Sequence, residues 1–379
     1  MSNVFAERSL RIHKKLKGKI AVTPKAPLKT IMDLNLYYTP GVAAVSSYLG
    51  EHTEKAAEYT MKGNMVAVIS DGSAVLGLGN IGPEGALPVM EGKAMLFKAL
   101  AGVDAFPIVL ATQQTEEIIS TIKNIAPGFG AINLEDISAP RCFEIEARLK
   151  KELTIPVFHD DQHGTALVVL AGLLNALKVV RKKLVSAHIV ISGAGAAGQA
   201  ITELLLKAGA QHIIVLDSKG IISRDRKDLD HHKKNLLKVI NKTHRRGSLS
   251  DALVKADVFI GVSKAGLLQV EDIKKMSAQP IIFALANPVP EIMPEIAKKA
   301  GAAVVATGRS DFPNQLNNSL GFPGIFRGAL DNGVRHISEE MLIRAAYNLA
   351  ALIAKPTAKK IIPTMFDKRI VAAVAKAMY

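Results

Sequence analysis

Cysteine and tryptophan are scarce in this sequence of 379 residues, which contains one cysteine and no tryptophan. A single cysteine, Cys142, cannot form an internal disulfide bond, and it fits a reducing compartment. The first residues, MSNVFAERSLRIHKKLKGKI, lack the continuous apolar segment of a secretory signal peptide. Together these absences predict a cytoplasmic protein.

Long apolar runs are also missing. The longest, TALVVLAGLLNALKVV at residues 165–180, is short for a membrane span and contains Asn175 and Lys178. We therefore expect a buried helix there and no membrane contact. The hydrophobic fraction of 49% is that of an ordinary globular protein, and the chain length predicts two domains.

Charge is unbalanced, with a formal net charge of +14 that could indicate a nucleic-acid partner. The positive side chains concentrate in residues 8–29 and 219–246. Neither segment contains an aromatic side chain on which a base could stack. We interpret both as solvated helix faces and expect no nucleic-acid partner. An NAD-binding regulator that contacts nucleic acid remains the alternative.

Short apolar runs alternate with helical patterns along the chain. The first half has such runs at residues 65–72, 105–112 and 155–161; the second half has them in AHIVISGAG, HIIVLDSKG, DVFIGVS, PIIFALANP and AAVVATGRSD. This alternation predicts parallel sheets with crossover helices, an α/β fold. We place a domain boundary near residue 162, giving an N-terminal α/β domain at 1–162. Residues 163–379 are then a doubly wound, Rossmann-type dinucleotide-binding domain with C-terminal helices.

The glycine pattern GxGxxG occurs twice. The first copy, residues 77–82, precedes Pro83, and we interpret it as a tight turn without a following helix. The second copy, GAGAAG at residues 193–198, follows a predicted strand and opens a predicted helix. Its glycines permit close approach to a pyrophosphate, and the helix N-terminus favours the negative charge. The predicted cofactor-binding residues of this loop are Gly193, Gly195, Ala196, Ala197 and Gly198.

Asp217 ends the next predicted strand, HIIVLD, where an acid bonds the adenosine ribose of NAD. Lys219, Arg224, Arg226 and Lys227 follow closely, and these side chains could neutralise the 2′-phosphate of NADP instead. We expect NAD as the cofactor, with some use of NADP.

Paired acids follow two apolar runs of the first half, Glu135-Asp136 in GAINLEDISAP and Asp160-Asp161 in PVFHDDQHGT. Carboxylates at the carboxyl ends of neighbouring strands gather at one edge of a sheet, where they repel unless a cation neutralises them. Oxygen ligands select Mg²⁺ or Mn²⁺ over zinc. The alternatives are that Asp161 caps the next helix, or that His159 and His163 bind zinc.

Other polar residues stand in apolar or constrained surroundings. Lys93 in VMEGKAMLF lies in a predicted buried helix, where a desolvated lysine has a lowered pKa and can act as a base. The alternative is a lysine that reaches the surface. Tyr38 precedes a Pro-Gly turn, Asn287 follows a predicted strand, and Asn318 precedes a rigid turn.

Seven segments, taken in order, resemble the malic enzymes of the short bacterial and archaeal type, which lack a transacetylase-like domain. The resemblance runs from about Leu34 to the last helix. The segments are YTPGVA, SDGSAVLGLGNIGPEGALPVMEGKA, GVDAFPI, INLEDI, HDDQHGTA, ALANPVPEI and TGRSDFPNQLNN.

The resemblance implies oxidative decarboxylation of L-malate to pyruvate and carbon dioxide with NAD(P) and a divalent metal, and decarboxylation of oxaloacetate. It implies Glu135, Asp136 and Asp161 as metal ligands and the histidines as supporting residues. It also implies catalytic roles for Lys93 as general base, Asp160 as its support and Tyr38 as general acid. Asn287 and Asn318 would hold the substrate, and Asn287 would contact the cofactor as well. We expect a homodimer or a larger homo-oligomer.

One position departs from the larger family members, which carry a substrate-binding arginine in the segment that matches SDGSAVLGLG. Here that position is Ala74. A two-domain amino-acid dehydrogenase is a rival interpretation, since it shares the architecture and a catalytic lysine. It needs no metal, so the paired acids argue against it.

Overall fold

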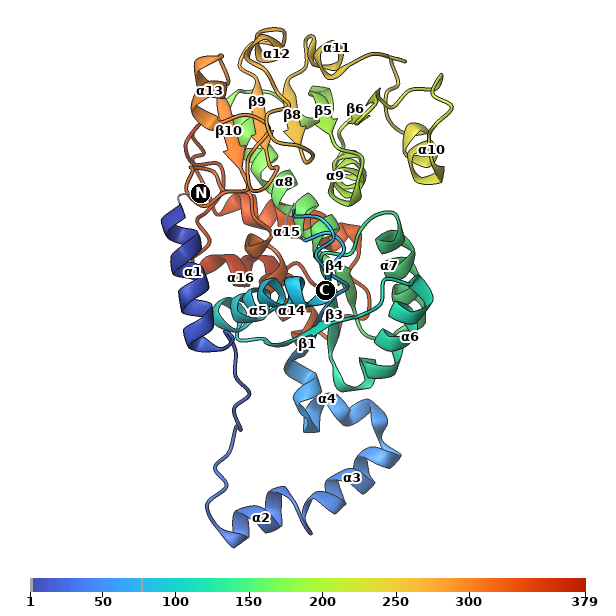
Figure 1. Ribbon diagram of the computed structural model, residues 1–379, viewed down its shortest axis with the longest axis vertical. Coiled ribbons are helices and arrows are strands. Elements are labelled where there is room, and N and C mark those ends of the chain that lie inside the picture. The colour runs from blue at the N-terminus through green and yellow to red at the C-terminus, as the bar shows by residue number, and fades with distance from the viewer. Residues whose placement is uncertain (1–2, 76–77) are drawn as a thin grey trace.

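The computed structural model of the protein describes residues 3–75 and 78–379. Two sheets of mainly parallel strands stack along the long axis of the molecule, and helices cover both (Figure 1). This confirms the predicted α/β class. Among the described residues, no helix is both long and apolar enough to cross a bilayer.

The first sheet has four parallel strands in the order β2-β1-β3-β4. Isoleucines of α6 and α7 cover one face, and Met90 and Phe97 of α5 lie against the other. The strands are Met65–Ser70 (β1), Asp104–Val109 (β2), Ala131–Leu134 (β3) and Val157–His159 (β4). Their helices are Gly82–Ala101 (α5), Thr115–Ile125 (α6) and Arg141–Glu152 (α7).

The second sheet has the order β10-β9-β8-β5-β6-β7. Its first five strands are parallel, and the short β7 is antiparallel to β6. The strands are His188–Ser192 (β5), His212–Asp217 (β6), Gly220–Ile221 (β7), Val258–Gly261 (β8), Ile281–Ala284 (β9) and Val304–Thr307 (β10). Its helices are Ala196–Lys207 (α9), His231–Leu237 (α10), Leu249–Leu253 (α11), Val270–Lys274 (α12) and Pro294–Lys299 (α13).

The long helix Asp160–Val179 (α8) runs between the two sheets (Figure 1). Its side chains from Ala166 to Leu173 are nearly all buried, which confirms the predicted buried helix. The helix begins earlier than expected, at Asp160, because the acids of its first turn are favourable beside the positive end of the helix dipole. The predicted domain boundary at residue 162 therefore falls in its first turn.

The C-terminal helices return to the first sheet. They are Phe322–Asp331 (α14), Glu339–Ala351 (α15) and Arg369–Ala375 (α16). The ring of Phe97 in α5 meets Phe322 and Phe326 of α14 at centroid distances of 4.7 and 5.2 Å. Because the chain crosses back in this way, the predicted boundary at 162 stays a prediction.

Near the N-terminus, helix Asn3–Leu16 (α1) is followed by a segment that extends away from the rest of the protein (Figure 1). We call residues 20–60 the arm. It contains Ile31–Tyr37 (α2), Val42–Glu51 (α3) and Ala56–Tyr59 (α4), and none of these helices has a buried residue. Its apolar side chains are unusually exposed, for example Ile31 at 78% and Met32 at 65%. Such a surface is typical of a segment that packs on a partner.

The prediction that no helix follows the first glycine motif is wrong. Helix α5 begins at Gly82 with Pro83 in its first turn, where proline is well tolerated because its missing N–H needs no partner. The turn itself is tight: a Cβ on Gly72 would lie 2.1 Å from the carbonyl oxygen of Gly82. Gly77 lies outside the described residues.

The aromatic contact between α5 and α14 should hold the C-terminal helices on the first sheet. We expect Phe97→Ala to lower the free energy of unfolding by about 3–5 kcal/mol, since it leaves a cavity at a fully buried site. Phe366→Ala is the matched control, because Phe366 is 77% exposed. Denaturant unfolding measures both, and equal effects in the two variants would contradict the packing described here.

Candidate active site

A cleft of about 910 Å³ lies between the two sheets, and most of the predicted site residues line it. The carboxyl ends of β3 and β9 open onto this cleft, as does the loop that precedes α9. Parallel α/β sheets place their ligands at such ends. The predicted residues that line it are Lys93, Glu135, Asp136, Asp160, Asp161, Gly195, Ala196, Ala197, Asn287 and Asn318.

Lys93 of α5 is buried, with 7% of its surface exposed, so the interpretation as a surface lysine is wrong. Its Nζ lies 2.5 Å from Oδ2 of Asp160 and also pairs with Oε2 of Glu135. The ammonium stands 4.6 Å above the ring of Phe322. The lysine is therefore held by two acids from two different elements.

The pKa of Lys93 is raised, and the prediction of a lowered pKa is wrong for this arrangement. Burial lowers it, but the charges of Asp160, Glu135 and Asp161 outweigh burial and favour the ammonium form. Burial raises the pKa of Glu135 in turn, and Asp161 adds to that effect while Lys93 opposes it. One ammonium faces four carboxylates here, so the cleft carries an excess of negative charge.

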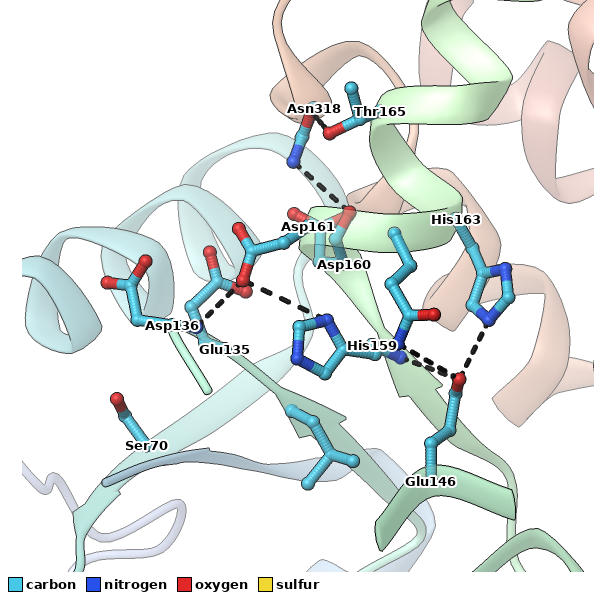
Figure 2. A network of polar contacts seen from close by, with 12 residues as sticks. Ser70, Glu135, Asp136, Glu146, His159, Asp160, Asp161, His163, Thr165 and Asn318 are labelled. Atoms are coloured by element: carbon cyan, nitrogen blue, oxygen red, sulfur yellow. Dashed lines mark hydrogen bonds and ion pairs between the residues drawn. The ribbon is translucent and has the colours of Figure 1, made fainter. Parts of the chain in front are cut away.

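The two acid pairs lie side by side because β3 and β4 are neighbours in the sheet. Oδ2 of Asp161 accepts a hydrogen bond of 2.8 Å from the backbone N–H of Asp136 (Figure 2). Asp161 is therefore no helix cap; the N-cap position of α8 belongs to His159. The side chain of Asp160 lies against the next turn of its own helix, and a Cβ on Gly164 would lie 1.8 Å from its Oδ1. Glycine is thus needed one turn after Asp160.

Carboxylate oxygens of Glu135, Asp136 and Asp161 are the ligand type that Mg²⁺ and Mn²⁺ prefer. These three acids therefore fit a hard divalent ion by the chemistry of their oxygen atoms. Their positions are not yet those of a metal site: Glu135 contacts Lys93, and within residues 3–75 and 78–379 no three His, Cys, Asp or Glu side chains are arranged to hold a metal ion.

Glu146 of α7 was missed from the sequence, although it anchors the start of α8. Its buried carboxylate accepts hydrogen bonds from the backbone N–H of His159 at 3.0 Å and from Nε2 of His163 at 2.9 Å (Figure 2). Burial raises its pKa, but His163 and Lys150 outweigh burial and hold the pKa well below its ordinary value. An acid on the apolar stripe of Cys142, Ile145 and Leu149 was the available signal. The ring of His163 is thus committed to Glu146, and Nδ1 of His159 lies 3.8 Å from Oδ2 of Asp161.

The dinucleotide loop has the tight geometry that its glycines predict. Gly193 has a φ of +123°, and a Cβ there would lie 2.7 Å from the carbonyl oxygen of Val262. A Cβ on Gly198 would lie 1.7 Å from the carbonyl oxygen of Gly193, so the helix packs directly on the loop. The space beside Gly195 is open, and α9 begins at Ala196. This leaves room for a phosphate at a helix N-terminus.

Asp217 lies in a second cavity, of about 680 Å³, that Gly193 and Gly195 also line. Arg226 grips its carboxylate with two hydrogen bonds of 2.7 and 3.0 Å, and Nζ of Lys233 adds one of 2.9 Å. Burial raises the pKa of Asp217, but these bonds lower it to about 2. Of the predicted basic residues, Arg226 pairs with Asp217, while Nζ of Lys219 pairs with Asp228 instead. Lys233 was not among the predicted residues.

The two predicted amides differ in their surroundings. Asn318 donates to the backbone oxygen of Asp160 at 3.2 Å and accepts a bond from Thr165 at 3.0 Å (Figure 2). Asn287 is exposed at the rim of the cleft, close to Gly308. Asn318 thus ties its loop to the first turn of α8, and Asn287 is free to meet a ligand.

Tyr38 is the one predicted catalytic residue that the structure does not bring to the cleft. It ends α2 in the arm, and 66% of its surface is exposed. The arm lies at the opposite end of the molecule from the second sheet (Figure 1). Within a single chain, Tyr38 and Lys93 therefore stand apart.

A buried lysine held by acids on one wall of a cleft, and a dinucleotide loop on the other, define a nicotinamide-dependent oxidoreductase. Two family models match the chain: "Malic enzyme, N-terminal domain" over residues 17–150 and "Malic enzyme, NAD binding domain" over residues 162–378. The chain therefore belongs to the malic enzyme family.

Individual relatives agree with this assignment. The chain is 56% identical over 375 residues to the bifunctional malic/malolactic enzyme of Bacillus subtilis, covering 98% of this chain and 92% of that one. It is 45% identical over 398 residues to the NADP-dependent malic enzyme of Halomonas elongata, covering 100% and 93%. The crystal structure of the NAD-dependent malic enzyme of Thermotoga maritima superposes with a TM-score of 0.95 at 50% identity, covering 98% of both chains.

Proposed function

We propose that this protein oxidises and decarboxylates L-malate to pyruvate and carbon dioxide, reducing NAD or NADP with a divalent metal, and that it also decarboxylates oxaloacetate. The observation that carries the proposal is the buried Lys93, held by Asp160 and Glu135 across the cleft from the dinucleotide loop. Membership of the malic enzyme family supports malate as the substrate of this site. The single cysteine supports a cytoplasmic location.

Lys93 acts in this proposal as the general base. The acids alone favour the ammonium form of Lys93, and a divalent cation among them would offset their charge and favour the neutral amine. The neutral Nζ takes the proton of the malate hydroxyl while hydride leaves the same carbon for the nicotinamide. The fully buried carboxylate of Asp160 positions Nζ of Lys93, since its Oδ2 is 2.5 Å away. Asn287 and Asn318, which also line the cleft, orient the substrate by hydrogen bonds.

Glu135, Asp136 and Asp161 would hold Mg²⁺ or Mn²⁺. When bound, the ion supplies a Lewis acid for negative charge that develops on the substrate oxygen. The excess of carboxylates around Lys93 supports a site for a divalent cation, because like charges this close repel one another. Glu146 and Asn318 keep the first turn of α8 in place for this purpose.

The roles of metal and base can be separated experimentally. Asp161→Ala should abolish both malate oxidation and decarboxylation of added oxaloacetate. Lys93→Ala should lower oxidation by roughly 10² to 10⁴, yet affect oxaloacetate decarboxylation less, because that step needs no proton abstraction. Both activities are measured at saturating manganese.

Lys98→Ala is the matched control, because Lys98 lies on the same helix with a 65% exposed side chain that pairs with Asp104. It should keep both activities. If Lys93→Ala still bound manganese but lost decarboxylation as fully as oxidation, the assigned roles would be wrong. The relative from Bacillus subtilis is named a malic/malolactic enzyme, so lactate is measured beside pyruvate.

For the cofactor we propose NAD with some use of NADP. Asp217 can form a hydrogen bond with a free ribose hydroxyl. Arg226 and Lys233 could bind a 2′-phosphate if they were not paired with Asp217. The relatives include both NAD- and NADP-dependent enzymes.

The kcat/KM with NAD should therefore exceed that with NADP, and Asp217→Ala should narrow the difference by freeing the two cations. Asp225→Ala is the control, since Asp225 is exposed and pairs with Arg246 instead. Initial rates with both cofactors measure this. A strong NADP preference in the unmodified protein would show that the basic cluster decides the cofactor.

We also propose a homodimer in which Tyr38 acts as general acid in the partner's cleft. The arm supports this arrangement, because its helices bury none of their residues within the chain while exposing apolar side chains. A two-fold arrangement would let each copy donate its arm to the other.

Mixed dimers test this assignment. Tyr38→Phe and Lys93→Ala chains, each inactive alone, are co-expressed with different tags. Random pairing should restore roughly a quarter of the unmodified activity, because half of the dimers then have one intact site of two. Without exchange between chains, every site keeps one defect and no activity returns, which would place Tyr38 in its own chain's site or outside catalysis.

A further inference from the structure

The cleft carries much negative charge for a site that takes a dicarboxylate. Four carboxylates line it, from Glu135, Asp136, Asp160 and Asp161. A dianionic substrate entering such a site is repelled unless cations offset the charge. Ala74 also lines the cleft and brings no charge to it.

Only two cationic side chains are found among the described residues that line the cleft, Lys93 and Lys19. Lys93 is already surrounded by acids, and it must be neutral to accept a proton. Neighbouring arginines are committed elsewhere: Arg141 pairs with Asp71 at 2.9 Å and Arg309 with Asp311 at 2.6 Å. Lys19 is the remaining source of positive charge in the described lining.

Lys19 is fixed beside the base rather than free in solvent. Its Nζ donates to the backbone oxygen of Pro88 at 2.5 Å, and Pro88 lines the same cleft as Lys93. A Cβ on Gly92 would lie 3.6 Å from this Nζ, so the ammonium packs over the residue just before the base. The contact places a cation on the same wall of the cleft.

The backbone of Lys19 is anchored separately from its charge. Oε2 of Glu91 accepts the Lys19 backbone N–H at 3.1 Å, and Gly18 makes the turn with a φ of +113° that favours glycine. In the described part of the chain, the Lys19 ammonium forms no ion pair with a carboxylate. Burial lowers the pKa of Lys19, with Glu91 opposing, as is typical of a partly desolvated cation that lacks a close counter-ion.

We propose that Lys19 binds a carboxylate of the dianionic substrate. The inference rests on the proposed function, because it takes malate as the substrate. A charge-assisted hydrogen bond from a lysine on the cleft wall would then select dicarboxylates over uncharged or monoanionic analogues.

The test uses Lys19→Met, Lys19→Arg and the matched control Lys17→Met in the full-length holoenzyme. Lys17 is exposed two residues away and does not line the cleft. Lys19→Met should raise the KM for malate by about 10- to 100-fold, the range for losing a charged hydrogen bond. The kcat, the KM for NAD and the melting temperature should stay near those of the unmodified protein. Lys19→Arg should recover most of the affinity, and Lys17→Met should change nothing.

Two results would overturn the inference. An unchanged KM for malate in Lys19→Met would show that the ammonium does not meet substrate. A parallel loss of malate affinity, NAD affinity and thermal stability, not recovered by arginine, would show that Lys19 only holds the segment on α5. Neither result touches the proposed function, which fails only if the unmodified protein does not reduce cofactor with malate.

Discussion

The contact of Lys93 with Asp160 and Glu135 is the interaction on which the site depends. It joins three elements: α5 supplies the lysine, β3 leads to Glu135, and the first turn of α8 supplies Asp160. A buried cation is costly unless acids compensate it, and the acids here repel one another unless a cation lies among them. The cation and the acids therefore stabilise one another in the buried site. Removing one partner would leave an uncompensated charge in the core. Glu146 supports the arrangement from α7 by binding the backbone of His159 and the ring of His163.

The fold converts this local pairing into a cleft with two walls. Helix α8 begins at the acids of the first sheet and packs along α9, whose N-terminus faces the dinucleotide loop. The C-terminal helices close the other side, with Phe322 in contact with both Phe97 and the Lys93 ammonium. A displacement of α14 would therefore change the contact between Phe322 and the Lys93 ammonium. Helix α8 thus runs from the acids of the first sheet into the core of the second, where it packs against the helix that follows the cofactor loop.

Much of this was predictable from the sequence, because strand ends and glycine loops have local signatures. The parallel strands, the dinucleotide loop and the meeting of the two acid pairs followed from short patterns. The raised pKa of Lys93 did not, because it depends on which acids lie around the ammonium in three dimensions. The same holds for Glu146 and for the grip of Arg226 and Lys233 on Asp217. The position of Tyr38 was hidden as well, since the packing of an exposed arm is decided by contacts beyond its own segment. The helix that follows the first glycine motif was not expected either, although the first turn of a helix tolerates a proline such as Pro83.

The most direct test of the central claim, that this cleft oxidises and decarboxylates malate, is an assay of the purified, unmodified protein. L-malate is supplied with NAD or NADP, with and without manganese, while reduced cofactor, pyruvate and carbon dioxide are all quantified. The account predicts that the three products appear in equal amounts and only when manganese is present. It would be contradicted if neither cofactor were reduced with malate, or if cofactor were reduced while oxaloacetate accumulated and no carbon dioxide formed.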